Sequence, residues 1–452
     1  MSNKKFSRPS LALFTAIALS GGAFFAPSFA FAADVMIDST HPPQRNVPNP
    51  DDPSTPNSAA SVGTGSEDAS GNSLTVDRYQ EDTLSVFGGV ARGTGNADGN
   101  TVRIKGATTE IASIYGGAAW GAGHAKGNKV YFDAGTMSFA EWLVGGYVGR
   151  SGTAEENTVE VNGGKTESLY GGFSNSRNAA GQIQKNHVVI RGGTIAGKVY
   201  GGVFGGAHAT GDVTHNTVTI TGGTLKREVC GGSLEKADST GNVAHNEVTV
   251  AGGVFRGDVY GGYTRRGGAL TGNIVTITDS TAEGFVYGGS TVDGGTASGN
   301  QINISGSTIK KAITGGYDST NGSVTGNTVT VSGSSTVENT IYGGYSNNTG
   351  TVTDNSVAIA GGTFQETIYG GYSDKSGTVT GNKVALTGGT FQDVIYGGAG
   401  GDPSSTETFT VNNNTVTIAG GTFSSNIYGG YSWKADGTTE NNTVNLGDDT
   451  HH

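Results

Sequence analysis

The chain has 452 residues, 80 of them Gly, and its 38 Asp and Glu outnumber its 27 Lys and Arg. Abundant Gly between recurring Val, Ile, Thr and Tyr argues against helices and favours many short strands joined by tight turns. The excess of negative charge argues against nucleic acid or an anionic membrane as a partner. Because the chain has one cysteine, Cys230, it cannot form an internal disulfide bond.

Residues 1–32 have the pattern of a secretory signal peptide. Basic residues precede the apolar run from Leu11 to Phe25, and a small-residue motif ends at Ala32, where we predict cleavage. Glycines and a proline interrupt the run, which is shorter than the roughly 20 residues that a membrane-spanning helix needs. We therefore expect an exported protein, extracellular or at the cell surface, with no transmembrane helix in the mature chain.

From residue 71 to about residue 446 the chain is periodic, and one Asn opens each unit at spacings of 27 to 32 residues. Apolar residues follow at the second and fourth positions after every Asn, which predicts a short strand with one buried face. The column consists of Asn72, Asn100, Asn128, Asn157, Asn186, Asn216, Asn246, Asn273, Asn300, Asn327, Asn355, Asn382, Asn414 and Asn442. Stacked amides can hydrogen-bond from unit to unit, so we interpret the column as a structural ladder.

Two further apolar columns recur in each unit, one before a Tyr-Gly-Gly motif and one three residues before the Asn. Three strands per unit, each pairing with its copy in the next unit, predict an all-β fold. The expected architecture is a right-handed parallel β-helix of about 14 coils. Residues Val213, Val218, Ile220 and Val229 should point into one core. A propeller is the competing architecture, but its blades need about 40 residues or more.

Both flanks of the repeat region differ from it in composition. Residues 33–70 are rich in Pro, Ser and Asn and poor in large apolar side chains, which predicts a disordered leader. Residues 447–452 form a short tail after the last unit. The repeat region is therefore expected to provide the whole folded part of the protein.

Two aromatic columns flank the double glycine. The Tyr before it predicts a ladder of rings, with the glycines forming a bend that side chains would block. The ring after it recurs less regularly and includes Tyr317, Tyr345 and Tyr372. An exposed line of such rings would be able to hold a glycan or a partner surface, whereas packing within the ladder would give them a structural role.

The tripeptide Arg256-Gly257-Asp258 matches the sequence that integrin ligands display on turns. Its place in the repeat predicts a turn just before a double glycine. It is a candidate contact for a host receptor, although three residues match by chance often in a Gly-rich chain.

The chain lacks the residue patterns that catalysis requires. Parallel β-helices that cleave polysaccharides gather carboxylates on one face across neighbouring coils, whereas here Asp and Glu change register from unit to unit. No Gly-x-Ser-x-Gly motif or calcium-binding repeat is present. His215 and His245 precede ladder residues on neighbouring units, either as a shared metal site or in solvated turns. We expect no enzymatic activity, no resident metal and no cofactor.

The units between residues 170 and 246 have longer return segments, which stacking would place on one edge of the rod. A glycan-binding or glycan-cleaving protein would need a groove beside these loops. It would also need carboxylates that converge near residues 173 to 245. These two features separate such a protein from a non-enzymatic adhesion module.

The signal peptide, the Asn-x-Val-x-Ile opening, the Gly-Gly-Thr-Phe turn and the Tyr-Gly-Gly-Tyr motif together resemble the passenger repeats of autotransporter adhesins. The resemblance covers residues 71 to about 446 and implies a passenger that crosses the outer membrane and acts at the cell surface. Its partner would be a protein or glycan on a host or bacterial surface. An outer-membrane barrel would have to be supplied in cis by a longer chain, or in trans. A non-enzymatic adhesion module is the leading hypothesis, and a glycan-binding or polysaccharide-cleaving β-helix is the alternative.

Overall fold

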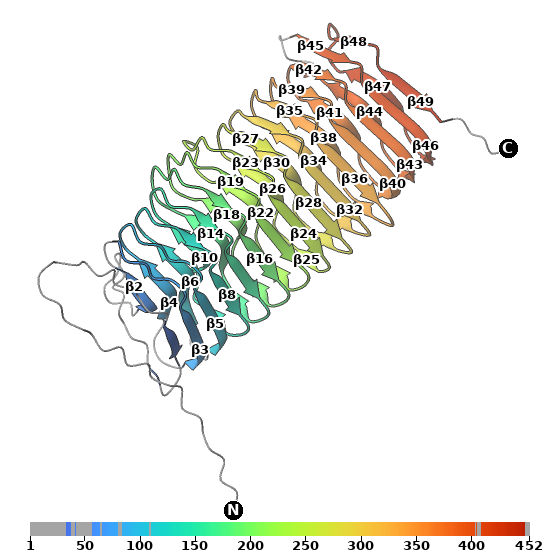
Figure 1. The fold of residues 1–452 in the computed structure, drawn as a ribbon. Coiled ribbons are helices and arrows are strands. Elements are labelled where there is room, and N and C mark those ends of the chain that lie inside the picture. Colours follow the sequence, from blue (N-terminus) through green and yellow to red (C-terminus); the bar gives the residue numbers. More distant parts are fainter. Residues whose placement is uncertain are drawn as a thin grey trace, which may run out of the picture.

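The computed structural model describes residues 33–37, 41, 57–63, 66–79, 84–107, 110–402, 404 and 408–447. The predicted signal peptide and, apart from Gly447, the predicted tail lie outside these residues. Within them the chain is all-β without a helix, and parallel strands stack into a solenoid of about 13 turns (Figure 1). The described residues therefore include no helix that could cross a membrane. The β-helix predicted from the repeat is confirmed.

One turn contains four strands, as the turn after Asn216 illustrates. They are β20 (Thr217–Ile220), β21 (Thr224–Leu225), β22 (Val229–Leu234) and β23 (Val243–Ala244). Each pairs in parallel with its equivalents on both neighbouring turns, so that β22 pairs with β18 (Val199–Phe204) and β26 (Val259–Thr264). The ladder of β23 forms a sheet of 12 strands, and the other three ladders connect into one of 37 strands.

The sequence predicted three strands per turn, and the additional one is the two-residue strand that follows the Gly-Gly turn. Its second residue points inward, since Leu225 in β21 and Phe255 in β25 (Val254–Phe255) are each 1% exposed. A strand this short shows no alternating pattern, so the sequence indicates only a turn there. Further along the rod, β40 (Ser356–Phe364) pairs with both the first and the second strand of the turn before it.

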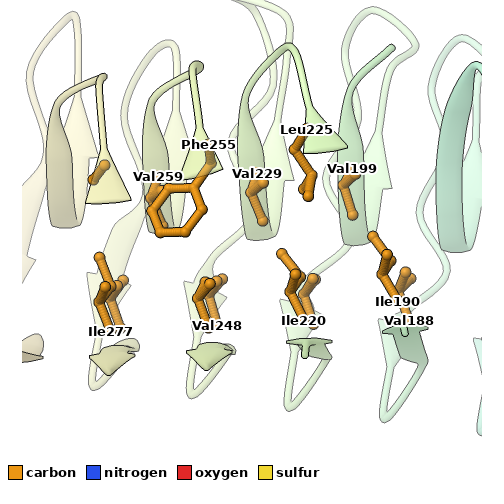
Figure 2. Packing of buried hydrophobic residues seen from close by; sticks show 14 of the residues in the cluster. Val188, Ile190, Val199, Ile220, Leu225, Val229, Val248, Phe255, Val259 and Ile277 are labelled. Atoms are coloured by element: carbon orange, nitrogen blue, oxygen red, sulfur yellow. The ribbon is translucent and has the colours of Figure 1, made fainter. Parts of the chain in front are cut away.

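The main core lies between the first strand of each turn and the two strands that follow. Figure 2 shows Ile220 and Val248 pointing across the interior toward Val229 and Phe255. Each of these side chains is at most 1% exposed. Because every turn covers the apolar side chains of the next, stacking fixes which face of each strand is buried.

A second, smaller core lies between the third and fourth strands. Val213 packs there with Phe204 and Leu234, whereas Ile220 and Val229 belong to the main core. The expectation that Val213 shares one core with them is therefore wrong. The reason is the Asn column, whose buried amides bond to the fourth ladder.

The Asn column forms a continuous chain of hydrogen bonds. Every member from Asn72 to Asn414 donates from Nδ2 to Oδ1 of the Asn on the next turn, over 2.6–3.0 Å. Asn216 also donates from Nδ2 to the carbonyl of Ile183, in the fourth ladder, and its backbone N–H to Oδ1 of Asn246. The buried amide thereby uses its donors and its acceptor, as a polar group in an interior must.

The double glycine lies inside an extended strand. Gly231 and Gly232 occupy the middle of β22, and neither has a positive φ. A Cβ atom on Gly232 would lie 2.5 Å from Nδ2 of Asn246, and one on Gly231 would lie 2.6 Å from the carbonyl oxygen of Gly261. The bend that the sequence suggested is therefore absent here, and glycine is required because the Asn ladder packs against the strand.

Two strands come from the segment whose composition predicts a disordered leader. These are β1 (Asp34–Ile37), which pairs with β3 (Ser73–Tyr79), and β2 (Asn57–Gly63), which pairs with β4 (Leu84–Ala91). Ile37 is fully buried in the main core. The solenoid therefore starts before residue 71, because these short segments bury apolar side chains by pairing with its first turn.

A buried carboxylate ends β34 (Ile313–Asp318). Oδ2 of Asp318 accepts the backbone N–H groups of Thr320 at 3.1 Å and Gly322 at 2.7 Å. Its Oδ1 is buried without a hydrogen-bond partner, as is Oγ1 of Thr291 at the equivalent position of the preceding turn. Burial raises the pKa of Asp318, although the two N–H donors oppose the shift.

We expect Asp318→Asn to stabilise the protein at neutral pH. Because the folded pKa is raised, the stability that the protonated carboxyl contributes is complete below the unfolded pKa of about 4 and is lost as the pH rises through the folded value. The amide keeps an acceptor for the loop and cannot ionise. The gain in free energy of unfolding over wild type should grow from pH 4 to pH 7, toward about 1 kcal/mol, and the melting temperature should rise with it. Parallel pH profiles for the two proteins would contradict this role.

Candidate functional site

The outer face of the third ladder carries stacked aromatic rings. Tyr342, Tyr369 and Tyr396 lie on successive turns, with ring centroids 5.2 and 5.1 Å apart and planes within 7° of parallel. Each ring covers a face of the next at a spacing close to that of the paired strands. Where the column has a ring on every turn, the faces of its rings therefore pack against one another.

The candidate binding rings Tyr317, Tyr345 and Tyr372 pack on this column and on one another. Tyr345 stacks on Tyr342 at 4.8 Å, and Tyr372 lies 4.9 Å from Tyr369. The centroids of Tyr317 and Tyr345 are 5.3 Å apart. All three are half-buried, so ladder packing accounts for much of their surface, and ligand binding by these rings stays a prediction.

The first aromatic column lacks a ring on three turns between β4 and β47 (Ile427–Ser432), at Val144, Cys230 and Thr314. On two of them a ring of the second column lies close to the remaining rings, since Tyr147 is 6.0 Å from Tyr115 and Tyr317 is 5.8 Å from Tyr287. The third is the turn of Cys230, where the second column also has no ring and carries Ser233. Within these described turns, only that of Cys230 has a ring in neither column.

This gap opens a cavity of about 200 Å³. Cys230 lies in register between Tyr200 and Tyr260, both of which line the cavity. Tyr200 stacks on the ring of the preceding turn at 5.6 Å, and Tyr260 on that of the following turn at 5.1 Å. The cavity thus lies where one ring is missing from the column. Each of the two rings that flank it stacks on a further ring on its other side.

Carboxylates and one ammonium border the cavity. Nζ of Lys198 pairs with Glu228 and lies 3.8 Å from Oε2 of Glu235. Oε1 of Glu235 accepts the hydroxyl groups of Tyr200 at 2.8 Å and Ser233 at 2.9 Å. Burial alone would lower the pKa of Lys198, but the hydrogen bond to Glu228 and the charge of Glu235 raise the pKa, so the ammonium stays charged.

Asp258 brings the predicted tripeptide to the rim of this cavity. Residues 256–258 connect β25 to β26, in the turn expected from the repeat. Oδ1 of Asp258 accepts the backbone N–H of Phe285 at 2.9 Å, and Oδ2 accepts the hydroxyl of Tyr260 at 3.1 Å. Arg256 is exposed and lies 3.6 Å from a glutamate of the next turn. A receptor contact through Arg256, Gly257 and Asp258 would compete with these internal bonds, and it stays a prediction.

A larger groove of about 570 Å³ adjoins the cavity on the N-terminal side and shares Lys198, Tyr200 and Glu235 with it. The residues that line both hollows come from the third ladder, from β10 (Trp142–Val148) and β14 (Ser168–Ser174) to β26, and from the segments beside it. Figure 1 shows these strands side by side. The volume of the groove falls within the range of about 300–1,000 Å³ that is usual for ligand sites.

Aromatic rings and the longer loops line the groove. Trp142 lies edge-on to Phe173 at 5.2 Å, and Phe173 stacks on Tyr170 at 4.4 Å. Phe139 also borders the groove and is 83% exposed, which is unusual for a large apolar ring. Lys236 comes from one of the longer return segments. The groove is therefore beside these loops, where the glycan-binding alternative required one.

The cavity side chains are set up to form hydrogen bonds. Burial raises the pKa of the Cys230 thiol well above its usual value, and Sγ donates to the carbonyl of Gly232 at 3.0 Å. Burial and the neighbouring carboxylates raise the pKa values of Tyr200 and Tyr260. The thiol and the two phenols are therefore uncharged and can form hydrogen bonds. The thiol in this form is not a nucleophile, because nucleophilic attack requires the thiolate.

The two histidines singled out in the sequence lie away from this site. The rings of His215 and His245 are 5.2 Å apart and inclined by 31°. Across the part of the chain that the structure describes, no group of three or more His, Cys, Asp or Glu side chains is arranged to hold a metal ion.

Sequence reasoning missed the side chains that form the cavity. Glu228 and Asp258 occupy the same position of the repeat on neighbouring turns and Glu235 a different one, and the three border one cavity because stacking brings neighbouring turns together. A signal was present at Cys230 and Ser233, the one unit in which both aromatic positions of the Tyr-Gly-Gly-Tyr motif are replaced while its flanking units keep a Tyr. A missing member of a regular column thus marks the site more clearly than any motif.

Comparisons with known proteins identify no relative. No family model matches the chain, and neither a curated protein nor a solved structure is significantly similar to it.

Proposed function

We propose that this protein is an exported, non-enzymatic surface module that binds carbohydrate in the groove and cavity over β10 to β26. The observation that carries the proposal is the missing rung at Cys230, where a cavity of about 200 Å³ is lined by Tyr200, Tyr260 and Tyr263. Export follows from the signal-peptide pattern of residues 1–32. The resemblance to autotransporter passengers supports a role of such a module at the cell surface, in adhesion or aggregation.

The dimensions of the gap favour a sugar ring. Tyr200 and Tyr260 are two strand spacings apart, or roughly 10 Å, so a ring midway between them would lie about 5 Å from each. That separation suits a puckered pyranose, whose C–H groups face the aromatic rings. The rim supplies acceptors for sugar hydroxyl groups at Glu228, Glu235 and Asp258.

The adjoining groove favours a chain of sugars over a single one. It extends the site past Tyr170 and Trp142 to the exposed ring of Phe139. An exposed aromatic side chain at the end of an aromatic-lined groove offers a stacking surface for a further sugar. An extended oligosaccharide would thereby contact several turns at once.

Replacing Cys230 with Tyr tests this proposal. The new ring would complete the column and fill the gap, so we expect binding of oligosaccharides, measured by calorimetric titration across a glycan panel, to weaken by about tenfold or more. The melting temperature should not fall, because equivalent positions already hold Tyr. Cys230→Ser, which leaves the gap open, is the matched control. Equal binding by Cys230→Tyr and wild type would contradict the proposed site.

A second candidate function, cleavage of the bound glycan, is favoured by the three carboxylates around one cavity. Two carboxyl groups flanking a glycosidic bond are the usual requirement for hydrolysis. Incubation with a binding oligosaccharide would distinguish the two functions. New reducing ends that disappear in Glu235→Gln would indicate an enzyme, and their absence in wild type supports a binding module.

A further inference from the structure

The groove concentrates positive charge on an acidic protein. Five cations line it, against two carboxylates, so its formal charge is +3, while the whole chain carries −11. The cations are Lys165, Lys198, Lys226, Arg227 and Lys236. A patch whose sign opposes that of the whole protein attracts a ligand of negative charge.

Most of these cations have no internal partner. Lys198 pairs with Glu228, but among the described residues no ion pair joins Lys165, Lys226, Arg227 or Lys236 to an acid, and all four are exposed. Some cations elsewhere on the rod are engaged, as in the pairs of Arg103 with Asp133 and Lys310 with Glu283. Four unpaired cations beside one groove are therefore free to meet a ligand.

The cations also follow the axis of the rod. Lys165 begins β13 (Lys165–Thr166), and Lys226 directly follows β21, two turns further on in the same ladder. Lys198 lies on the turn between them, just before β18. Three successive turns, about 5 Å apart along the axis of the rod, thus each carry a cation beside the groove, at three different positions of the turn.

We infer that the carbohydrate is an anionic polysaccharide with a negative group on successive sugars, lying along the groove with its charges against Lys165, Lys198 and the Lys226–Arg227 pair. This inference rests on the proposed function and names its substrate class. The negative group is a carboxylate or a sulfate. A polyanion without rings is disfavoured, because the aromatic lining and the gap at Cys230 would remain unused.

Matched probes test the charge separately from the sugar. Oligogalacturonate and its methyl ester have the same sugar backbone, but only the acid is charged. We expect the acid to bind wild type at least about tenfold more tightly at low salt, with the difference shrinking as salt is added. The double variant Lys226→Glu/Arg227→Glu should lose that difference and keep its affinity for the ester. Lys383→Glu, an exposed cation several turns away in β43 (Lys383–Phe391), should behave as wild type.

Each other result has a definite meaning. Equal affinity for acid and ester would overturn the inference and leave the proposed function intact. Failure of acid, ester and sulfated oligosaccharides to bind would instead overturn the proposed function. Tighter binding of a sulfated oligosaccharide than of the acid would support the inference and identify sulfate as the negative group. A single-stranded oligonucleotide of equal charge that binds as tightly as the acid would overturn the inference.

Discussion

Ile220→Asp is expected to destabilise the solenoid by about 4 kcal/mol or more, because it places a charge in the main core. Ile220 is 1% exposed, and its neighbours on adjoining turns are Ile190 and Val250. No cation is available in this apolar column to pair with the carboxylate. The melting temperature followed by circular dichroism should fall by many degrees.

A substitution one position earlier provides the control. Thr219 is half-buried on the opposite face of β20, so Thr219→Asp should change stability by no more than about 0.5 kcal/mol. Because each turn contacts only its neighbours, the damage from Ile220→Asp should begin locally, with new proteolytic cleavage near residues 190–250. An unchanged melting temperature would mean that the register of the strands is wrong.

Asn246→Asp is expected to break the ladder at its centre. The substitution keeps the shape and the acceptor for Asn216, but an oxygen replaces Nδ2, which donates to Val213 at 2.9 Å and to Asn273 at 3.0 Å. Two buried donations become contacts between acceptors, with a buried charge added. We expect a loss of about 3 kcal/mol at neutral pH. Part of this should be regained in acid, where the protonated carboxyl can donate once.

The last member of the column provides the matched control. Asn442 is half-buried, and its Nδ2 donates to the carbonyl of Val411 at 2.7 Å. Asn442→Asp therefore removes a single donation near solvent and should cost about 1 kcal/mol. Equal losses for the two variants would show that ladder bonding contributes little beyond the burial of an amide.

The repeating features of the fold could be predicted from the sequence because each residue recurs at the same place in every turn. The apolar residues at the second and fourth positions after each Asn are the buried face of the first strand, and the Asn residues bond in one column. Strands of only two residues, and strands outside the repeat, could not be predicted from the sequence. The two-residue strand ending at Leu225 carries too few residues to show alternation, and β1 and β2 precede the first Asn of the column, in a segment rich in Pro, Ser and Asn.

The tripeptide and the aromatic line could be located from the sequence, but their surroundings could not. The hydrogen bonds of Asp258 to Tyr260 and Phe285 depend on the side chain at this one turn, because the equivalent position holds Glu228 on the preceding turn and Phe285 on the following one. The stacking of Tyr345 on Tyr342 likewise depends on the orientation of two rings across a double glycine. Such contacts follow from side-chain geometry, which spacing along the chain does not specify.

By itself the sequence determined the period, the Asn column, the apolar columns and the class of fold, since stacking equal units leaves few other ways to bury their apolar faces. Only the tertiary structure decided which side chains border the proposed binding site. Lys198, Glu228 and Asp258 belong to three different turns, and they border one cavity because parallel pairing brings residues about 30 positions apart to within roughly 5 Å. In a regular solenoid, side chains that differ from turn to turn contact one another only when the turns stack, and these contacts form the candidate site.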